Sequence, residues 1–200
     1  DLFIKHSRYL CSLISSSILG TDAPLPFEDI DWKFLLLLSE KQDVVLMASP
    51  AIKKLSLPEE IKPVFKELHN FYLARITKQN IEAEAVFDAL SSQNIRYIKM
   101  KGYHIKEYYP NNFMRSYTDA DLCLDKENLI KAKPIMESMG YTLNNTTSYH
   151  DEYEKDGFHI FELHSELVSD KEKYAGIFSD LFSKSDMHHS PTDLRLKPEY

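Results

Sequence analysis

The sequence predicts an α+β protein, with a helical region first and a mixed sheet after it. Up to about residue 92, apolar residues recur with a period near 3.6, which is typical of amphipathic helices. From residue 93 onward, short β-prone runs are separated by turn signals, which is typical of strands. We therefore expect an N-terminal helical region (1–92), an α/β core (93–185) and a polar tail (186–200).

Four helices are expected in the helical region. Their approximate ranges are 2–19, 27–40, 44–55 and a long helix that begins near residue 57 and continues past Leu90. Asp1 is available as the N-cap of the first helix, and Gly20 as its stop. Trp32 is expected in the core, because large aromatic residues are normally buried. Since the last helix is unusually long, a kink or break is expected near 77–80.

The α/β core is predicted to combine strands with helices. In chain order the expected elements are a strand at 95–101, a short helix at 104–109, a strand with the aspartates described below, a helix at 126–139, a strand at 141–143, a hairpin turned by Asp156-Gly157 and a helix near 174–182. Pro134 should kink the helix at 126–139, and Gly140 should end it. An Asp-Gly pair between β-prone runs predicts a hairpin, because a type I′ turn needs positive φ.

Two carboxylates stand two positions apart in the run Arg115-Ser-Tyr-Thr-Asp119-Ala-Asp121-Leu. In a strand, residues i and i+2 project to the same face, so Asp119 and Asp121 should lie side by side. Ala120 and Leu122 would then turn into the core. Two like charges so close repel each other unless a cation lies between them, and hard oxygen ligands suit Mg²⁺ or Mn²⁺. The alternative is a pair of solvated turn residues, because exposed acidic clusters are common.

Glu162 is a third candidate ligand, in the run His159-Ile-Phe-Glu-Leu-His164. Alternation along this run puts Glu162 and His164 on one face, and Phe161 and Leu163 on the other. An edge strand with its polar face in water would also explain the pattern. Together with the aspartate pair, however, three carboxylates on adjacent strands can converge on two metal ions, which clamp the reacting oxygens in phosphoryl or nucleotidyl transfer.

These motifs follow one another in a specific order: a Lys101-Gly102 turn, a short helix, Arg115-x-x-x-Asp119-x-Asp121-Leu, a helix, a glycine, and an apolar-Glu162-apolar-His164 strand. This order resembles the uncharacterised bacterial nucleotidyltransferases of the DNA polymerase β superfamily, over residues 30–170. The resemblance implies a minimal polymerase β-like mixed sheet with the N-terminal helical region packed on it. It also implies Mg²⁺-dependent (or Mn²⁺-dependent) transfer of an NMP group from an NTP substrate to a hydroxyl acceptor.

Carried over residue by residue, the resemblance assigns Asp119, Asp121 and Glu162 to catalysis and to metal binding. Either Asp121 or Glu162 would accept the proton of the acceptor hydroxyl. The resemblance does not identify the acceptor, for which a sugar, an antibiotic-like metabolite and a protein side chain are candidates.

The resemblance also assigns residues to the nucleotide. Lys101 and Gly102 take the place of the glycine turn that contacts the triphosphate, and Arg115 matches an arginine that this branch carries before the aspartates. His164 would orient Glu162 or touch the substrate. Tyr103 departs from the family pattern, which has a serine after the glycine. For the lysine, the arginine and the histidine, an ordinary solvated or partly buried side chain is the competing interpretation.

Composition is that of an ordinary globular protein. The chain has 200 residues, of which 43% are hydrophobic, and a net charge of −7. No stretch concentrates Lys and Arg, so nucleic acid, which requires many phosphate contacts, is disfavoured as a partner. No apolar run approaches the roughly 18 residues that a membrane span requires. The two cysteines, Cys11 and Cys123, favour a reducing compartment, and a cytoplasmic protein is expected.

Two rival functions compete with nucleotidyl transfer. A catalytically silent nucleotide-binding or regulatory interaction module with the same fold is favoured by the altered glycine turn. A metal phosphodiesterase would need histidines interleaved with the aspartates, and that pattern is missing. Because residue 1 is not methionine and Tyr200 follows a polar stretch, we expect a fragment of a longer protein. The sequence leaves the oligomeric state open.

Overall fold

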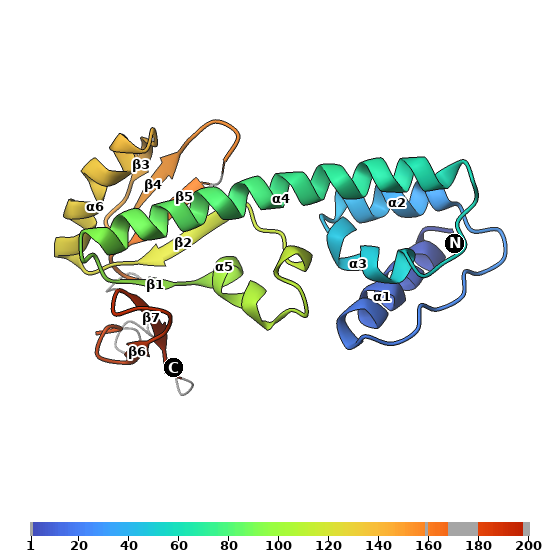
Figure 1. The fold of residues 1–200 in the computed structure, drawn as a ribbon, viewed down its shortest axis with the longest axis horizontal. Helices are drawn as coiled ribbons and strands as arrows, with labels where there is room; N and C mark the ends of the chain where they lie inside the picture. The colour runs from blue at the N-terminus through green and yellow to red at the C-terminus, as the bar shows by residue number, and fades with distance from the viewer. Residues whose placement is uncertain (1, 159, 168–179, 198–200) are drawn as a thin grey trace. The chain divides into compact units, whose positions relative to one another are not determined.

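The structure is a computed structural model that describes residues 2–158, 160–167 and 180–197 (Figure 1). The chain forms two compact units. The first takes in the chain up to Thr77 together with Lys106–Ser116, and the second takes in Lys78–Ile105 and the chain from Tyr117 onward. The boundary near residue 92 that the sequence suggests remains a prediction.

The first unit is helical. Its elements are α1 (Leu2–Leu19), α2 (Trp32–Lys41), α3 (Val45–Ile52), the part of α4 (Ile61–Ser92) up to Thr77, and the 3-10 helices η1 (Lys106–Tyr108) and η2 (Asn112–Met114). The apolar faces of the α-helices meet in a core that includes Leu13, Leu35 and Ala51, none of which has exposed surface. Trp32 is buried in the same core, as the sequence predicts.

Helix α2 begins later than its sequence pattern suggests, because Asp31 is its N-cap. The Oδ1 atom of Asp31 accepts a hydrogen bond from the backbone N–H of Phe34 at 2.9 Å. The backbone N–H of Asp31 in turn donates to Nε2 of His6 at 3.0 Å. Since Nε2 of His6 is an acceptor, its Nδ1 carries the proton and donates to the carbonyl of Leu2 at 2.8 Å. The start of α2 is thereby attached to α1.

Helix α4 is continuous from Ile61 to Ser92, so a break near residues 77–80 does not occur, and the kink expected there stays a prediction. That stretch contains neither Pro nor Gly, the usual causes of a sharp kink. The residues of α4 that belong to the second unit include Ala83, Val86 and Leu90, which are completely buried.

The second unit contains a mixed seven-stranded sheet, which confirms the predicted α+β class (Figure 1). In sheet order its strands are β3 (Thr142–Thr146), β4 (His150–Glu154), β5 (Ile160–His164), β2 (Asp119–Cys123), β1 (Tyr97–Lys99), β7 (Asp193–Leu196) and β6 (Ser185–Met187). The β2–β5 and β1–β7 pairs are parallel, and the other four pairs are antiparallel.

Two strands occupy the region where the sequence suggests a polar tail, at residues 186–200. Strand β7 pairs with β1, and β6 pairs with β7. Leu194 of β7 packs against Ile98 and Cys123 in a small apolar cluster. This burial is the reason that the segment joins the sheet, and the expectation of a tail is wrong for residues 186–196.

One face of the sheet is covered by the second half of α4. The ring of Phe87 stacks on Tyr97 at 5.4 Å between centroids and meets Tyr103 edge-on at 4.9 Å. Phe87 also contacts Phe161 of β5, at 6.3 Å. Because strand side chains alternate, this packing directs the neighbouring residues of β2 and β5 to the opposite face.

Three further sequence predictions concern a hairpin and two helices. The hairpin between β4 and β5 is confirmed, with Gly157 at φ 76°. Helix α6 (Lys126–Ser138) is assigned without interruption, although it contains Pro134. Pro134 and Ile130, whose carbonyl loses its partner, are both exposed, so water can satisfy that carbonyl. The helix expected near 174–182 lies, up to residue 179, outside the described residues.

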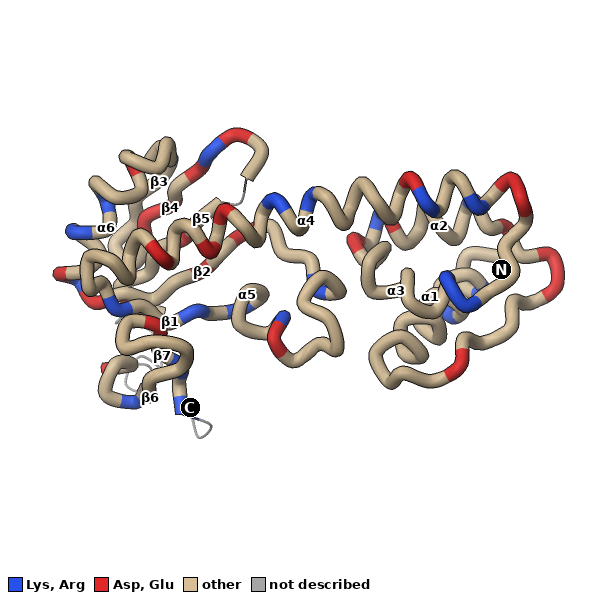
Figure 2. The backbone as a smooth tube through the Cα atoms, in the orientation of Figure 1, with Lys and Arg blue, Asp and Glu red and all other residues tan. Residues whose placement is uncertain are grey.

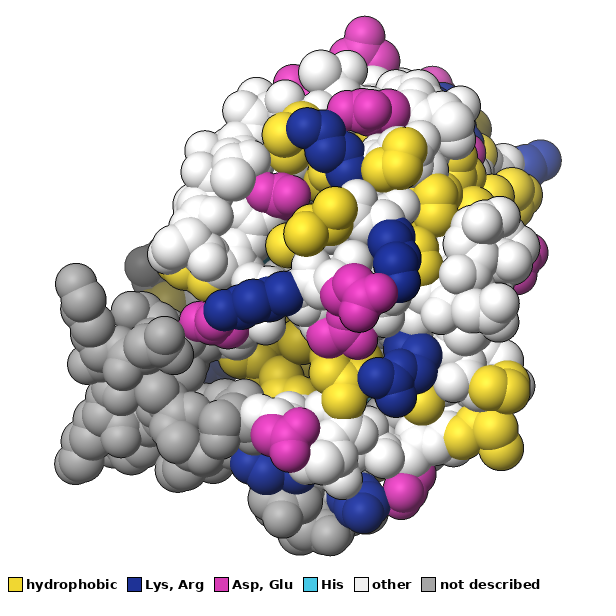
Figure 3. Space-filling model, turned by 90° about the vertical axis from the view of Figure 1, so that its left-hand side faces the viewer, with side chains coloured by type: hydrophobic (Ala, Val, Ile, Leu, Met, Phe, Trp, Pro, Cys, Tyr) yellow, Lys and Arg dark blue, Asp and Glu magenta, His cyan; other side chains and the backbone are white. Residues whose placement is uncertain are grey.

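Charged residues of both signs are spread along the chain (Figure 2). On the face drawn in Figure 3, Lys and Arg side chains lie next to Asp and Glu. Helix α6 carries an ion pair between Lys131 Nζ and Glu127 Oε1 at 2.6 Å. None of the described helices combines the length and the apolar character that a membrane crossing would need.

Candidate active site

Strand β2 carries the two aspartates as the sequence predicts. Ala120 and Leu122 are completely buried on the side of the sheet that faces the core. Asp121 projects to the other side and also has no exposed surface, whereas Asp119, at the start of the strand, is half-buried.

Strand β5 brings Glu162 and His164 to the same face. It runs parallel to β2, with Glu162 in register with Asp121. The Nε2 atom of His164 lies 3.1 Å from Asp121 Oδ1 and 3.1 Å from Glu162 Oε2. These contacts place the three side chains together, because a single imidazole nitrogen lies within hydrogen-bond distance of both carboxylates.

Lys101 also reaches the two carboxylates. It is the first residue of α5 (Lys101–Ile105), and its Nζ donates to Asp121 Oδ1 at 2.5 Å. The same Nζ lies 3.6 Å from Glu162 Oε2. The backbone before it is tied to β2, because the N–H of Met100 donates to the carbonyl of Asp121 at 3.0 Å. A contact between the lysine and the carboxylates was not expected from the sequence.

The contacts within this cluster keep Asp121 and Lys101 in their charged forms. Burial alone would raise the pKa of Asp121, but hydrogen bonds from His164 and Lys101 outweigh it and hold that pKa below its usual value. Burial lowers the pKa of Lys101, but Asp121, Glu162 and Asp119 together raise it above its usual value. Asp121 is therefore an anion and Lys101 a cation at neutral pH.

The donor atoms of the site fit a divalent cation. Asp121, Glu162 and His164 each offer a ligand atom, and these atoms lie within 4.8 Å of one another. Asp121 Oδ2 is buried and has no hydrogen-bond partner among the residues that the structure describes. A buried carboxylate oxygen without a partner calls for an explanation, and a bound ion supplies one. Carboxylate oxygens are the ligands that Mg²⁺ and Mn²⁺ prefer.

Asp119 lies on the same face but outside this trio. Its Oδ1 accepts a hydrogen bond from Thr118 Oγ1 at 3.5 Å. The sequence groups Asp119, Asp121 and Glu162 as metal ligands, whereas the atoms that the structure brings closest belong to Asp121, Glu162 and His164. The role of Asp119 as a ligand stays a prediction.

The Lys101-Gly102 segment differs from the open turn that the sequence suggests. It is the first turn of α5, three residues earlier than the expected helix start, and Gly102 is buried. Among the described residues, positive φ occurs at Lys101 (45°) and not at Gly102. The lysine, not the glycine, has the unusual backbone.

Arg115 belongs to the first compact unit, where its Nη1 donates to the neighbouring carbonyl of Ser116. Its assignment to the nucleotide stays a prediction. Cys123, the last residue of β2, is buried, and burial raises the pKa of its thiol to about 12, so the thiol remains protonated. Cys123 packs with Ile98 and Leu194 in an apolar cluster, as a small apolar residue would.

Sequence reasoning missed His150 on β4. It pairs in register with His164, and the two rings lie 5.2 Å apart. Its Nδ1 lies 3.0 Å from Thr147 Oγ1, which fixes the ring. The alternation of His150 and Glu152 on β4 was a signal that could have placed both on the polar face of the sheet.

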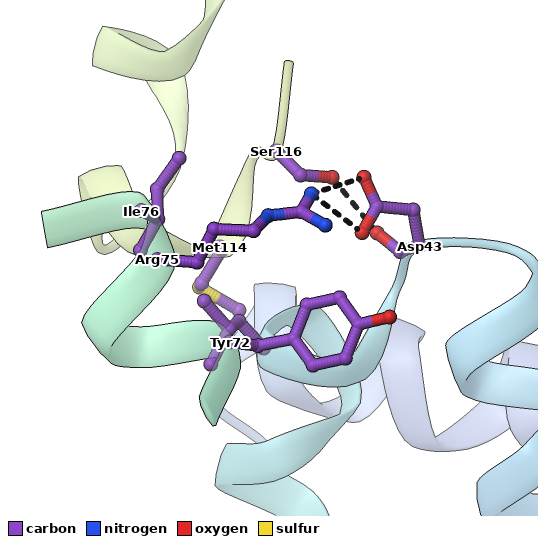
Figure 4. Close-up of a pocket in the computed structure, with 7 residues that line it drawn as sticks. Asp43, Tyr72, Arg75, Ile76, Met114 and Ser116 are labelled. Carbon is purple, nitrogen blue, oxygen red and sulfur yellow. Dashed lines mark hydrogen bonds and ion pairs between the residues drawn. The ribbon is translucent and has the colours of Figure 1, made fainter. Parts of the chain in front are cut away.

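A small hollow in the first unit is a different kind of feature (Figure 4). Its lining includes Arg75, whose Nη2 lies 3.3 Å from Asp43 Oδ1, and Ser116, whose Oγ donates to the carbonyl of Asp43 at 2.8 Å. The guanidinium of Arg75 also lies 5.0 Å from the ring of Tyr72. The hollow has room for about one water molecule (10 Å³), and its polar groups already form hydrogen bonds and an ion pair with one another.

Comparison with known proteins gives two matches. A family model described as uncharacterised nucleotidyltransferase matches residues 28–198. Among solved structures, the chain is similar to the antibiotic-resistance factor ANT(2'')-Ia in its solution structure, at 17% sequence identity and a TM-score of 0.40. That match covers 48% of this chain and 51% of the other, so it spans about half of that protein. No curated protein matches the chain. Since the family model covers most of the sequence, the chain belongs to the uncharacterised nucleotidyltransferase family.

Proposed function

We propose that the protein is a metal-dependent nucleotidyltransferase of the DNA polymerase β type, which moves an NMP group from an NTP to a hydroxyl acceptor. The observation that carries this proposal is Asp121, a completely buried carboxylate with one unpartnered oxygen, beside Glu162 and His164 on a parallel strand pair. Family membership supports the reaction class. A cytoplasmic location is part of the same proposal.

In this proposal Asp119, Asp121 and Glu162 hold Mg²⁺ or Mn²⁺. The metal would stabilise charge on the phosphoryl oxygens and lower the pKa of the acceptor hydroxyl. His164 orients the two carboxylates through its contacts with Asp121 and Glu162. Such positioning and charge stabilisation are the main contributions of a protein to phosphoryl transfer.

Glu162 is the better candidate for accepting the proton of the hydroxyl. Its side chain keeps 22% of its surface exposed, whereas that of Asp121 has none. The pKa of Asp121 is held below its usual value, which makes this carboxylate a poorer proton acceptor than an ordinary aspartate. We therefore assign proton transfer to Glu162 and assign Asp121 to metal binding.

Lys101, Gly102 and Arg115 remain assigned to the nucleotide. A lysine at the start of a helix beside the carboxylates supplies positive charge where a triphosphate would lie. The acceptor stays open between a sugar, an antibiotic-like metabolite and a protein side chain.

The second candidate is a catalytically silent module that binds nucleotide or a partner. The ion pair of Lys101 with Asp121 favours it, because a lysine already neutralises a proposed metal ligand. The two functions differ in turnover, so a single assay separates them.

The test is incubation with each labelled NTP and Mn²⁺, followed by measurement of pyrophosphate release and of labelled protein. Turnover that disappears in Asp121→Asn supports the transferase. If the wild type releases no more pyrophosphate than this variant with any NTP, while nucleotide still binds, the silent module is the correct function.

A further inference from the structure

Lys101 contacts the same carboxylate atoms that the proposed metal requires. Its ammonium lies 2.5 Å from Asp121 Oδ1 and 3.6 Å from Glu162 Oε2. His164 approaches the same two oxygens, at 3.1 Å each. The ammonium of Lys101 supplies a full positive charge to this pair of carboxylates.

The need for that charge follows from burial. Asp121 has no exposed surface, and a buried carboxylate is costly unless it is paired with a cation or coordinates a metal. Lys101 meets this need at some cost of its own, because its φ of 45° lies in a region that side chains other than glycine seldom adopt. The surrounding structure therefore fixes the backbone of Lys101 beside the carboxylates.

The ammonium group of Lys101 can nevertheless move away from the carboxylates. Its side chain keeps 57% of its surface exposed, in contrast to the completely buried side chain of Asp121. The contact is thus made from the solvent side of the site, and rotation of the flexible lysine stem would withdraw the ammonium without any rearrangement of the sheet.

We infer that Lys101 is a built-in cation that occupies the metal position of the metal-free protein and is displaced when a divalent cation binds. The inference rests on the proposed function for the presence of a metal site. A divalent ion and an ammonium cannot share Asp121 Oδ1 and Glu162 Oε2, because like charges repel at such distances. Lys101 is therefore a positioning residue before metal binding and a competitor during it.

Displacement gives the lysine a second partner. Once the ammonium leaves the carboxylates it remains tethered at the rim of the site, where the phosphates of a nucleotide would attract it. A nucleotide that holds the displaced lysine then favours metal binding, and the metal favours nucleotide binding by the same factor, because such coupling is reciprocal.

The test is calorimetric titration of MnCl₂ alone into the wild type and into Lys101→Met. Removal of the competing charge should tighten Mn²⁺ binding by up to about fivefold, the size expected for loss of one close charge pair that is partly exposed. The matched control is Lys131→Met, which removes a lysine from an ion pair on the surface of α6 and should leave Mn²⁺ affinity unchanged.

Thermal unfolding gives an independent measure. In EDTA, Lys101→Met should unfold at a lower temperature than the wild type, because the carboxylates lose their cation. Addition of MnCl₂ should raise its unfolding temperature by more than it raises that of the wild type. Lys101→Gln removes the charge but keeps a hydrogen-bond donor, and it serves as the second variant if Lys101→Met does not fold.

The outcomes separate the two proposals. Tighter Mn²⁺ binding by both neutral variants, with no change in the control, supports the inference. Equal Mn²⁺ affinity in wild type and neutral variants overturns the inference and leaves the proposed metal site intact. Absence of Mn²⁺ binding from every variant overturns both.

Discussion

The buried negative charge of Asp121 is stabilised by two neighbouring side chains. Lys101 and His164 both bond to Oδ1, and Oδ2 has no partner among the described residues. A change of this residue to asparagine keeps the shape of the side chain and removes its charge. The consequences for activity and for folding can therefore be separated.

Asp121→Asn should abolish turnover while the protein remains folded. Loss of the charge removes the proposed principal metal ligand, and loss of one preorganised electrostatic group typically lowers kcat by about 10²–10³-fold. Pyrophosphate release measures the effect. Asp186→Asn is the control, since Asp186 is exposed and its oxygen lies 3.9 Å from Lys197. Equal loss of activity in both variants would contradict the assignment.

His69 gives the first unit a pH-dependent contribution to stability. Its Nε2 accepts from Lys53 Nζ at 2.8 Å and its Nδ1 donates to Ser49 Oγ at 2.9 Å, so the ring is neutral in the folded protein. Burial, together with the charge of Lys53, lowers the pKa of His69 below its usual value of 6.5. Below pH 6.5 this histidine binds a proton more readily in the unfolded chain than in the folded protein. The free energy of unfolding therefore decreases as the pH is lowered.

His69→Gln should therefore reduce the loss of stability between pH 7.5 and pH 5.5. Urea unfolding at both pH values gives the free energy of unfolding, and the difference between wild type and variant isolates this residue. His189→Gln, at an exposed histidine, is the control. An identical pH dependence in wild type and His69→Gln would show that the ring does not resist protonation.

At the scale of elements, β7 is held to β1 by a buried ion pair. Lys99 Nζ lies 2.9 Å from Asp193 Oδ2, and the two side chains keep only 8% and 5% of their surfaces exposed. The ammonium of Lys99 also lies 4.5 Å from the centre of the Phe87 ring. The pair lies on the face of the sheet that α4 covers.

Asp193→Asn should destabilise the protein by about 3–5 kcal/mol, because it leaves a buried ammonium without its counter-charge. Asp186→Asn on the neighbouring strand removes an exposed carboxylate and should cost at most about 1 kcal/mol. Urea unfolding measures both. A loss of similar size in the two variants would mean that water reaches Lys99.

Local pattern was sufficient to predict the elements that form from neighbouring residues. Helix α1 follows from its apolar period and ends before Gly20, and the β4–β5 hairpin follows from a glycine that can adopt positive φ. The common face of Asp121 and Glu162 could also be predicted, because strand alternation fixes it once the strands are known.

Elements that depend on distant partners could not be predicted in the same way. Strand β6 is the short polar run Ser185–Met187, and β7 joins the sheet only because β1 offers it an edge and an apolar neighbour. The contact of Lys101 with Asp121 depends on how α5 begins, which no periodicity in the sequence reveals. Such features belong to tertiary structure.

At the scale of the whole molecule, ligand binding should appear as stabilisation. A metal and a nucleotide that bind only the folded protein raise its free energy of unfolding by mass action, by about 2.7 kcal/mol at a hundredfold excess over Kd. For a chain of this size, that corresponds to a rise in Tm of roughly 5–10 °C. The double variant Asp119→Asn plus Asp121→Asn should lose the effect.

Thermal unfolding with MgCl₂ or MnCl₂ and each NTP is the measurement. Magnesium without nucleotide and nucleotide with EDTA are the controls that separate the two ligands. A wild type whose Tm does not change at saturating metal and nucleotide would argue against this site, whatever the cause of any activity observed.

The position of β7 has a consequence for the order in which the protein is synthesised. Lys99 and Asp193 are 94 positions apart, whereas the strands that carry Asp121 and Glu162 are complete once residue 164 has been made. During translation the carboxylates can therefore assemble while one edge of β1 still lacks its neighbour. Until β7 arrives, that edge is open to pairing with another chain, and Lys99 has no counter-ion. Nascent chains stalled before Asp193 would thus carry an assembled site on an aggregation-prone sheet.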